Sequence, residues 1–314
     1  MTGQPTMTGQ PVICVVGSIM TDMISYVPRL PGPGETLIGG RFEIGFGGKG
    51  ANQAVMARRL GASVRMIACV GRDAFGDQAV ENLVAQGIDA QSVYRSSAAT
   101  GVAPIWVEAD GTNRIAVIPG ANDDMDPEQV AKTVLAQPAQ VVIGQLEVPQ
   151  PVTLAAFGAA RGAGSVTILN PAPAAEIVPE LLAVTDWVIP NETEFVSLVS
   201  SLLSSEVGSV ADDDVVALAS SISPRLLVTL GEAGALMVED GEAMRLPAPL
   251  SQVVDTTGAG DAFVGSFGFG LASGLGPASA MALALRCASF TVSRRGTQSS
   301  FPTPEEAEQL LRGR

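Results

Sequence analysis

The stretch VRMIACVGRDAFGDQAVENLVAQG, residues 64–87, shows the repeating unit of the fold. Its first part, VRMIACVG, is an apolar run with the length of a buried strand. Its second part predicts a helix around Phe75–Gln86. A buried strand that leads directly into a helix is the unit from which parallel sheets are built.

The same unit recurs on both sides of this stretch. Before it, VICVVG (residues 12–17) predicts a strand, and GANQAVMARRLGA (residues 50–62) predicts a helix that ends at Gly61. After it come four short buried strands, each followed by a helical or capping segment: AQVVIGQLE, SVTILNP, DWVIPN and RLLVTLG. The alternation predicts an α/β fold, with a mostly parallel sheet covered by helices on both faces. No repeat or linker indicates a second globular domain, so we expect one domain over residues 12–314.

Two segments depart from this alternation. Residues 21–48 and 100–122 contain hairpin-forming strands, and the second segment turns at Asp110-Gly111. We expect strands at about 23–46 and 101–120 to pair into a small antiparallel flap over one end of the main sheet.

Composition excludes several classes of function. The net charge of −14 speaks against nucleic acid or an anionic membrane as a partner. The chain has no histidine, which excludes an imidazole base, a histidine metal ligand and a Ser-His pair. Cys14, Cys69 and Cys287 are odd in number and far apart, which predicts buried thiols in a reducing compartment, the cytoplasm.

Two segments bear on targeting and membranes. Residues 1–11 repeat MTGQP without the apolar core of a signal peptide, so we expect a disordered leader or an alternative start. Residues 262–285 carry no charge and are long enough to span a membrane. Three serines and a Gly276-Pro277 break interrupt this run, which favours two buried helices at about 259–273 and 277–293.

The loop GFGGKGAN, residues 45–52, precedes a predicted helix. It is not a P-loop, because no Ser or Thr follows the lysine. A closely approaching backbone and the amide of Asn52 suit a polyhydroxy ligand. The alternative is a tight strand-to-helix turn that binds nothing.

The loop DTTGAGD, residues 255–261, places three small residues between two aspartates. If a helix begins near Ala259, its free N–H groups and its dipole can hold phosphate oxygens without a lysine. Asp261 in the first turn then has two interpretations. It is either an acid that complements the helix dipole or a base that accepts a proton from a hydroxyl attacking phosphorus. Spacing leaves both open.

In this order, GFGGKGANQA, QLE, NPAP, NETE, TLG and DTTGAGD resemble the ribokinases of the PfkB-type carbohydrate kinase family. The resemblance runs from about Val12 to Pro302, and DTTGAGDAF is a strong signature of the family. It implies an α/β sandwich with a β-lid, through which many relatives form homodimers. It also implies transfer of phosphate from Mg²⁺-ATP to the 5-hydroxyl of D-ribose, with K⁺ as an activating cation.

The resemblance assigns roles residue by residue. Asp261 corresponds to the catalytic base, and the anion hole to Gly258, Ala259 and Gly260. The positions that correspond to sugar-binding residues are Met20, Asp22, Gly48, Lys49, Gly50, Asn52, Glu147 and Asp261. Those that correspond to the ATP and Mg²⁺ site are Asn191, Glu194, Thr229, Gly231, Gly234 and Gly260. The K⁺ ligands correspond to Asp255, Thr257, Thr291, Arg294, Gly296 and Ser300, several through backbone carbonyls.

Each assignment has a simpler alternative. Glu147 can be a surface residue, Asn191 a helix cap and Asp22 a turn residue. The chain also departs from the family pattern GSxNxD, because Met20 stands where an asparagine amide is expected to bond a ribose hydroxyl.

Other functions therefore stay open. One is a kinase for deoxyribose, a keto-sugar or a nucleoside, and another is a non-catalytic sugar- or nucleotide-binding regulator. GGKGAN together with QLE favours a small free sugar, and the intact Asp261 motif argues against a regulator.

Overall fold

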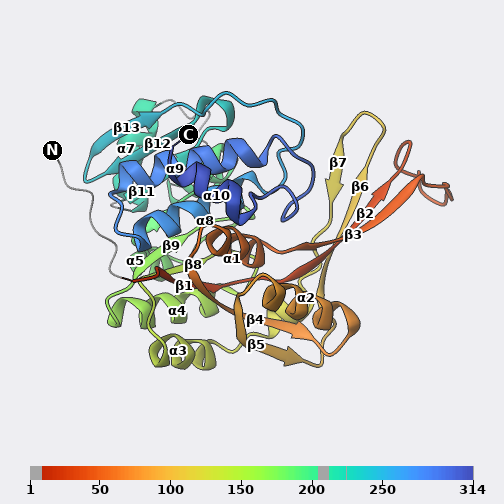
Figure 1. The fold of residues 1–314 in the computed structure, drawn as a ribbon, viewed down its shortest axis with the longest axis horizontal. Coiled ribbons are helices and arrows are strands. Elements are labelled where there is room, and N and C mark those ends of the chain that lie inside the picture. Colours follow the sequence, from red (N-terminus) through yellow and green to blue (C-terminus); the bar gives the residue numbers. More distant parts are fainter. Residues whose placement is uncertain (1–8, 204–211, 224, 314) are drawn as a thin grey trace.

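The computed structural model describes residues 9–203, 212–223 and 225–313, so residues 1–8 of the expected leader lie outside the described part. The body is a nine-stranded sheet in the order β13-β12-β11-β10-β9-β8-β1-β4-β5 (Figure 1). Neighbouring strands from β11 to β5 pair in parallel, which confirms the predicted class. The strands are β1 (Val12–Val16), β4 (Ser63–Gly71), β5 (Asp89–Ser96), β8 (Val141–Gly144), β9 (Val166–Leu169), β10 (Trp187–Val188), β11 (Arg225–Thr229), β12 (Ala235–Glu239) and β13 (Glu242–Leu246).

Helices cover both faces of this sheet, because successive side chains of a strand point to opposite sides. In β1, Ile13 and Val15 pack into one core, whereas Cys14 and Val16 pack into the other. The first core is closed by α1 (Lys49–Arg59), α2 (Ala74–Ala85), α8 (Ala259–Ala272), α9 (Pro277–Thr291) and α10 (Pro304–Leu311). The second is closed by α3 (Pro127–Ala136), α4 (Gln150–Gly162), α5 (Pro179–Ala183), α6 (Glu192–Leu203) and α7 (Asp212–Ile222).

The uncharged run after Asp261 forms the two predicted buried helices, α8 and α9. The chain breaks between them at Gly274, which has a φ of 78°, and Pro277 opens α9. Phe267 of α8 packs edge-to-face on Trp187, with ring centroids 5.0 Å apart. In the described part of the chain, no helix combines the length and the apolar character needed to cross a membrane.

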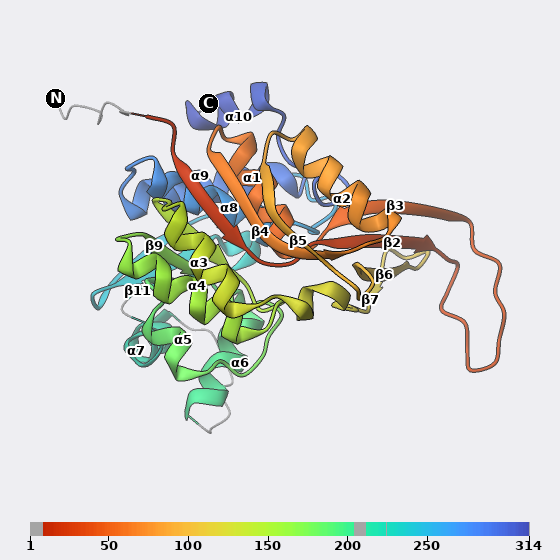
Figure 2. The same cartoon turned by 90° about the horizontal axis from the view of Figure 1, so that it is seen from below.

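The two hairpin segments form a separate sheet that projects from the body (Figures 1 and 2). Its four described strands are β2 (Met20–Tyr26), β3 (Arg41–Gly47), β6 (Gly101–Val107) and β7 (Asn113–Ile115). Each hairpin is antiparallel as expected, but the hairpins join through a parallel β2–β6 pair. The expectation of a wholly antiparallel flap is therefore wrong, because β2 and β6 leave the body in the same direction.

The structure also contains strands that the sequence pattern did not predict. Strand β5 lies at one edge of the large sheet, and the hairpin β12–β13 forms the other. The chain after RLLVTLG enters a short 3₁₀ turn, Gly231–Ala233, and then this hairpin. Another 3₁₀ turn, Gly120–Asp124, follows β7 at the base of the lid.

Candidate active site

The two glycine-rich loops meet because helices α1 and α8 pack closely. GGKGAN leads into α1, and DTTGAGD leads into α8. At Gly265 of α8, a Cβ atom would lie 2.6 Å from the carbonyl oxygen of Gln53, so only glycine allows this approach. The first turns of both helices therefore contribute side chains to one site.

Asp261 lies where these turns meet, and it is only 7% exposed. Its Oδ2 accepts a hydrogen bond from Asn52 Nδ2 at 2.9 Å, and its Oδ1 accepts one from Gln53 Nε2 at 3.0 Å. One amide donor on each oxygen leaves each oxygen able to accept a further donor. The carboxylate can therefore accept the proton of a nearby hydroxyl, as a general base must.

The turn that precedes Asp261 is open on its outer side. Gly258 caps α8 with a φ of 79°, and the helix begins at Ala259 as predicted. Gly260 is exposed, and apart from its chain neighbours and the backbone of its own helix no described atom lies within 4 Å of the position that a Cβ would take. The first N–H groups of a helix lack partners within the helix and attract anions together with its dipole. This turn therefore fits a phosphate or a phosphoryl group in transfer.

Met20 and Asp22 lie at the root of the lid, on the same face of β2. Their partners on β3 are Gly47 and Gly45, which carry no side chains. The carboxylate of Asp22 lies over Gly47 so closely that a Cβ there would overlap it. Asp22 is a buried residue inside a strand, so the turn interpretation is wrong.

Gly48 and Gly50 pack against the backbone of residues 17–19, where a Cβ on either would come within 3.0 Å. They thus make the tight turn that was the simpler interpretation of this loop. Between them, the Lys49 backbone N–H donates to Glu147 Oε2 at 2.8 Å. The Ser18 hydroxyl donates to the same oxygen at 2.5 Å. Glu147 is half-buried and held at this turn, so its interpretation as a surface residue is wrong.

Charges are concentrated at this site. Burial raises the pKa of Asp22 to about 6, and repulsion from Glu147 and Asp261 contributes. Burial likewise raises the pKa of Glu147, although Lys49 opposes the shift. Burial alone would lower the pKa of Lys49, but the surrounding carboxylates outweigh it and raise the pKa. Lys49 therefore keeps its charge, whereas Asp22 titrates close to neutral pH.

The NETE segment reaches the same site from α6. Asn191 and Glu194 cap the helix reciprocally: Asn191 N donates to Glu194 Oε2 at 2.9 Å, and Glu194 N donates to Asn191 Oδ1 at 2.8 Å. Burial raises the pKa of Glu194, which also interacts electrostatically with Lys49 and Asp261. Thr229 pairs with Asn191 at the neighbouring strand end. Gly231 and Gly234 bracket the turn that follows, both with positive φ.

The residues expected to hold K⁺ come from two segments that Asp255 joins. Asp255 Oδ1 accepts from Thr257 N, and Oδ2 accepts from Gly296 N, both at 2.9 Å. Burial would raise the pKa of Asp255, but these N–H groups outweigh it and lower the pKa, so the carboxylate stays ionised.

The side chains of the other expected K⁺ ligands are engaged locally. The Thr291 hydroxyl donates to Cys287 O, and the Ser300 hydroxyl donates to Thr297 O. The Arg294 guanidinium makes two bonds to Glu306 and lies 4.2 Å from the Phe290 ring centroid. A cation at this place would therefore meet Asp255 and backbone carbonyls. No cluster of three or more His, Cys, Asp or Glu side chains suited to a metal occurs among the described residues.

Sequence reasoning missed four amide side chains around Asp261. They are Gln53, Gln145, Asn170 and Gln298, and all are buried. Gln53, Gln145 and Asn170 lie inside segments that had been noted for other residues, namely GANQA, QLE and NPAP. Gln298 lies between two expected K⁺ ligands, Gly296 and Ser300. For Gln145 and Asn170 the available signal was an amide at the end of an apolar strand, and for Gln53 an amide at the start of a buried helix. Gln298 lies in the segment between α9 and α10, where the sequence gives no such signal.

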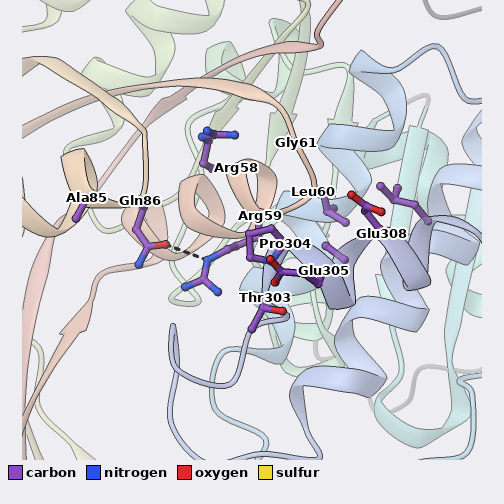
Figure 3. Close-up of a pocket in the computed structure, with 12 residues that line it drawn as sticks. Arg58, Arg59, Leu60, Gly61, Ala85, Gln86, Thr303, Pro304, Glu305 and Glu308 are labelled. Carbon is purple, nitrogen blue, oxygen red and sulfur yellow. Dashed lines mark hydrogen bonds between the residues drawn. The ribbon is translucent and has the colours of Figure 1, made fainter.

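A separate pocket of about 680 Å³ lies at the other end of α1 (Figure 3). It is lined by Arg58 and Arg59, by the end of α2 and by α10, and Arg59 Nε donates to Gln86 Oε1 at 2.9 Å. None of the residues expected to bind sugar, nucleotide or cation lines this pocket.

Comparison with known proteins agrees with this geometry. The model of the pfkB family carbohydrate kinases matches residues 10–304. A deoxyribokinase of Salmonella typhi is 37% identical over 95% of this chain and 98% of its own, and a mouse ribokinase is 38% identical over 95% and 94%.

Solved structures are similar over the same length. A ribokinase of Thermotoga maritima superimposes with a TM-score of 0.87 at 33% identity, covering 96% of this chain and 99% of its own. The ribokinase of Arabidopsis thaliana, solved with ribose and ATP, gives 0.85 at 30% identity over 96% and 99%. The chain is therefore a kinase, and it belongs to the pfkB family of carbohydrate kinases.

Proposed function

We propose that this kinase transfers the γ-phosphoryl group of ATP to the 5-hydroxyl of D-ribose, giving D-ribose 5-phosphate and ADP. The observation that carries the proposal is the Asp261 carboxylate, buried and held by two amides directly below the open turn at Gly258–Gly260. Ribokinases among the relatives, one of them solved with ribose and ATP, support the choice of sugar.

Asp261 acts as the general base in this proposal. It takes the proton of the 5-hydroxyl as that oxygen bonds to the γ-phosphorus, and the bond from phosphorus to the bridging oxygen of ADP breaks. The N–H groups of Gly258, Ala259 and Gly260 stabilise the charge on the transferring group. The protein otherwise supplies position and excludes water, because phosphoryl transfer needs little covalent help.

The sugar lies between the lid root and the first turn of α1. Asp22 and Glu147 offer carboxylate acceptors for its hydroxyl groups, and Asn52 offers an amide. Gly45 and Gly47, opposite Asp22 and Met20, carry no side chains, which lets the Asp22 carboxylate lie over Gly47 at the root of the lid. Lys49 balances the charge of the surrounding acids.

The nucleotide occupies the neighbouring strand ends, with Asn191 and Glu194 on one side and the turn of Thr229, Gly231 and Gly234 on the other. The Glu194 carboxylate fits a hydrated Mg²⁺, because Asn191 holds it at this strand end and Mg²⁺ prefers carboxylate oxygen ligands. Mg²⁺ neutralises the phosphate charge when it is bound with ATP. K⁺ fits beside Asp255, which stays ionised and joins the two segments that supply backbone carbonyls.

A second candidate substrate is 2-deoxy-D-ribose. Met20 is buried on the same face as Asp22, and its thioether cannot donate a hydrogen bond to a sugar hydroxyl. The curated relatives also include a deoxyribokinase at 37% identity. A keto-sugar or nucleoside kinase has no such observation in its favour.

The decisive experiment is ADP release with Mg²⁺-ATP and D-ribose, 2-deoxyribose, fructose or adenosine, each in K⁺ and in Na⁺ buffer. Turnover with D-ribose supports the main proposal, and a preference for 2-deoxyribose supports the second candidate. Absence of turnover with both pentoses would contradict the assigned sugar site. Asp261→Asn should lower kcat by several orders of magnitude while ATP still binds, and near-normal turnover in this variant would refute the base assignment.

The lid face opposite Asp22 supports a homodimer. Phe42, Ile44 and Phe46 alternate along β3 and are all exposed in the single chain. An apolar row on an open sheet is a liability unless a second copy covers it. For location, all three cysteines of the chain are free and buried, which favours a reducing compartment such as the cytoplasm.

A further inference from the structure

Two chains of amide side chains converge on Asp261, one on each carboxylate oxygen. The first begins on α2, where Asn82 Nδ2 donates to Gln298 Oε1 at 3.0 Å. Gln298 Nε2 then donates to Asn52 Oδ1 at 3.0 Å, and Asn52 Nδ2 donates to Asp261 Oδ2 at 2.9 Å. This chain links α2 and the segment after α9 to the catalytic carboxylate.

The second chain comes from the strand ends beneath the site. Gln145, directly after β8, donates through Nε2 to Gln53 Oε1 at 2.6 Å. Gln53 Nε2 donates both to Asp261 Oδ1 at 3.0 Å and to Asn170 Oδ1 at 3.1 Å. Asn170 Nδ2 in turn donates to Ile189 O at 2.9 Å. Gln53 and Gln145 have no exposed surface, so water does not replace these bonds.

The donor-to-acceptor direction of the hydrogen bonds in both amide chains follows from the charge of the Asp261 carboxylate. An ionised carboxylate only accepts hydrogen bonds, so Asn52 and Gln53 must turn their NH₂ groups toward Asp261. Their carbonyl oxygens then face away and accept from Gln298 and Gln145. Each outer amide thus fixes the orientation of an inner one, and together they fix the plane of the carboxylate.

We propose that Gln53 and Gln298 are positioning residues for the base Asp261, which rests on the proposed function of this site. Gln53 holds Oδ1 directly, and Gln298 holds Oδ2 through Asn52. The two chains keep the unused lone pairs of the carboxylate directed at the substrate hydroxyl. Both inner donors bond to a carboxylate oxygen, and such charge-assisted hydrogen bonds hold its position more firmly than neutral ones.

Gln53→Met removes the donor at nearly constant length, and Gln298→Met removes the outer donor of the other chain. Gln86→Met is the matched control, because the Gln86 amide accepts from Arg59 in the separate pocket (Figure 3). We expect Gln53→Met to lower kcat about 10- to 100-fold, because the bond to the charged Asp261 oxygen is lost together with the bonds that tie Gln53 to Asn170 and Gln145. The KM values for sugar and ATP should stay within about two-fold, because the lost bond positions the base rather than a substrate. Gln298→Met should lower kcat less, since it acts through Asn52.

The pH profile separates positioning from a general loss of packing. Asp22, Lys49, Glu147 and Glu194 are the charged groups that act on this site, and no variant alters them. Loss of the Gln53 donor in Gln53→Met should lower kcat across the whole pH range. Gln53→Glu should instead lose activity as pH rises, because the new carboxyl donates a hydrogen bond to Asp261 only while it is protonated.

A crystal structure of Gln53→Met without substrate gives a readout that does not depend on activity. The Asp261 carboxylate should rotate from its wild-type plane, and in Gln86→Met it should not. If the wild-type protein phosphorylates no pentose, the proposed function is wrong. The plane of the Asp261 carboxylate in the variant structures still shows whether Gln53 positions it. The proposal would be overturned if both Gln53→Met and Gln298→Met kept the wild-type kcat and the wild-type plane of the Asp261 carboxylate. If Gln53→Met does not fold, Gln298→Met at the rim of the site decides alone.

Discussion

Asp22→Asn should make the folded protein more stable at neutral pH. The substitution keeps the shape of the side chain and removes a charge that lies beside Glu147 and Asp261. The pKa of Asp22 is about 6 in the folded state against an ordinary value of 3.8. Below the ordinary value, Asp22 is protonated in both states and carries no charge-related cost. Above the folded value it is ionised in both states, and only the folded state bears the cost of burying the charge.

The size of the effect follows from the shift. One pKa unit corresponds to about 1.4 kcal/mol, so ionised Asp22 lowers the free energy of unfolding by about 3 kcal/mol at pH 8 and about 1.5 kcal/mol at pH 5. For a chain of this length, about 1 kcal/mol changes Tm by about 1.5 °C. We therefore expect Asp22→Asn to raise Tm by about 4 °C at pH 8 and by about 2 °C at pH 5, measured by circular dichroism.

Asp73 provides the control, because its pKa is lowered in the folded protein whereas that of Asp22 is raised. Asp73 accepts bonds from Gly76 N, Thr100 N and the Thr100 hydroxyl, and these bonds outweigh burial and lower its pKa. The ionised Asp73 carboxylate stabilises the folded state above the ordinary pKa of an aspartate, and this stabilisation is lost as the pH falls through the lowered pKa of Asp73. Asp73→Asn should therefore lower Tm at pH 8. An equal rise in Tm at both pH values for Asp22→Asn, or a fall at pH 8, would refute the reasoning.

The ionisation of Asp22 should also change the KM for the sugar. If the Asp22 carboxylate accepts hydrogen bonds from sugar hydroxyls, the KM for the sugar should rise as pH falls below about 6 and Asp22 becomes protonated. The KM of Asp22→Asn should be higher at neutral pH and should not vary over this range. If the wild-type KM for the sugar does not change between pH 8 and pH 5, the Asp22 carboxylate does not bind the sugar.

Three further substitutions test the remaining assignments. Met20→Asn should raise kcat/KM for D-ribose relative to 2-deoxyribose by about 10-fold, because an amide can bond the 2-hydroxyl; an unchanged ratio would remove Met20 from the sugar site. Asp255→Ala should abolish the difference between K⁺ and Na⁺ buffers in the ADP-release assay, and a retained difference would place the cation elsewhere. Ile44→Glu should convert a dimer into monomers in sedimentation, since it puts a charge in the apolar row of β3; a wild-type monomer would contradict the dimer directly.

The large sheet was predictable because its central strands are buried on both faces. VICVVG and VRMIACVG are almost wholly apolar. VRMIACVG leads directly into α2, whereas the lid strands β2 and β3 lie between VICVVG and α1. The strands that escaped prediction lie at the two edges of the sheet. Strand β5, DAQSVYRS, is mixed and half-exposed, and β12 and β13 are joined by a tight turn at Asp240-Gly241, where both residues have positive φ. That Asp-Gly pair is a hairpin signal in the sequence.

The positions of the motifs were predictable for a related reason. QLE, NPAP and NETE each follow a strand, and the carboxyl ends of parallel strands lie at one edge of the sheet. The partners of Asp261 were not predictable in this way. Gln53, which bonds Asp261 directly, and Gln298, which acts through Asn52, both lie far from Asp261 in the chain. The direction of each amide is also decided only when the carboxylate beside it is placed. Sequence spacing contains neither fact.

NETE shows why spacing left two interpretations open. Asn191 and Glu194 form the reciprocal helix cap that the spacing allows, and the same Glu194 also lies within electrostatic range of Asp261. The two roles use the same atoms, because a capped helix start holds a carboxylate rigidly at the strand end. The cap was therefore not an alternative to a role at the site but the means of placing Glu194 there.

The two interpretations of Asp261 can be separated by burial. An acid that only complements a helix dipole works from the surface, and nothing is gained by withdrawing it from water. Asp261 is instead buried beside Glu147 and Asp22, and two α1 side chains bond its oxygens. Placing several acids and amides in one buried cluster is costly for a fold, and such costs concentrate where chemistry requires them. The position of Asp261 in the first turn of α8 still matters for the proposed mechanism, because it sets the carboxylate directly below the N–H groups that would bind the transferring phosphoryl group.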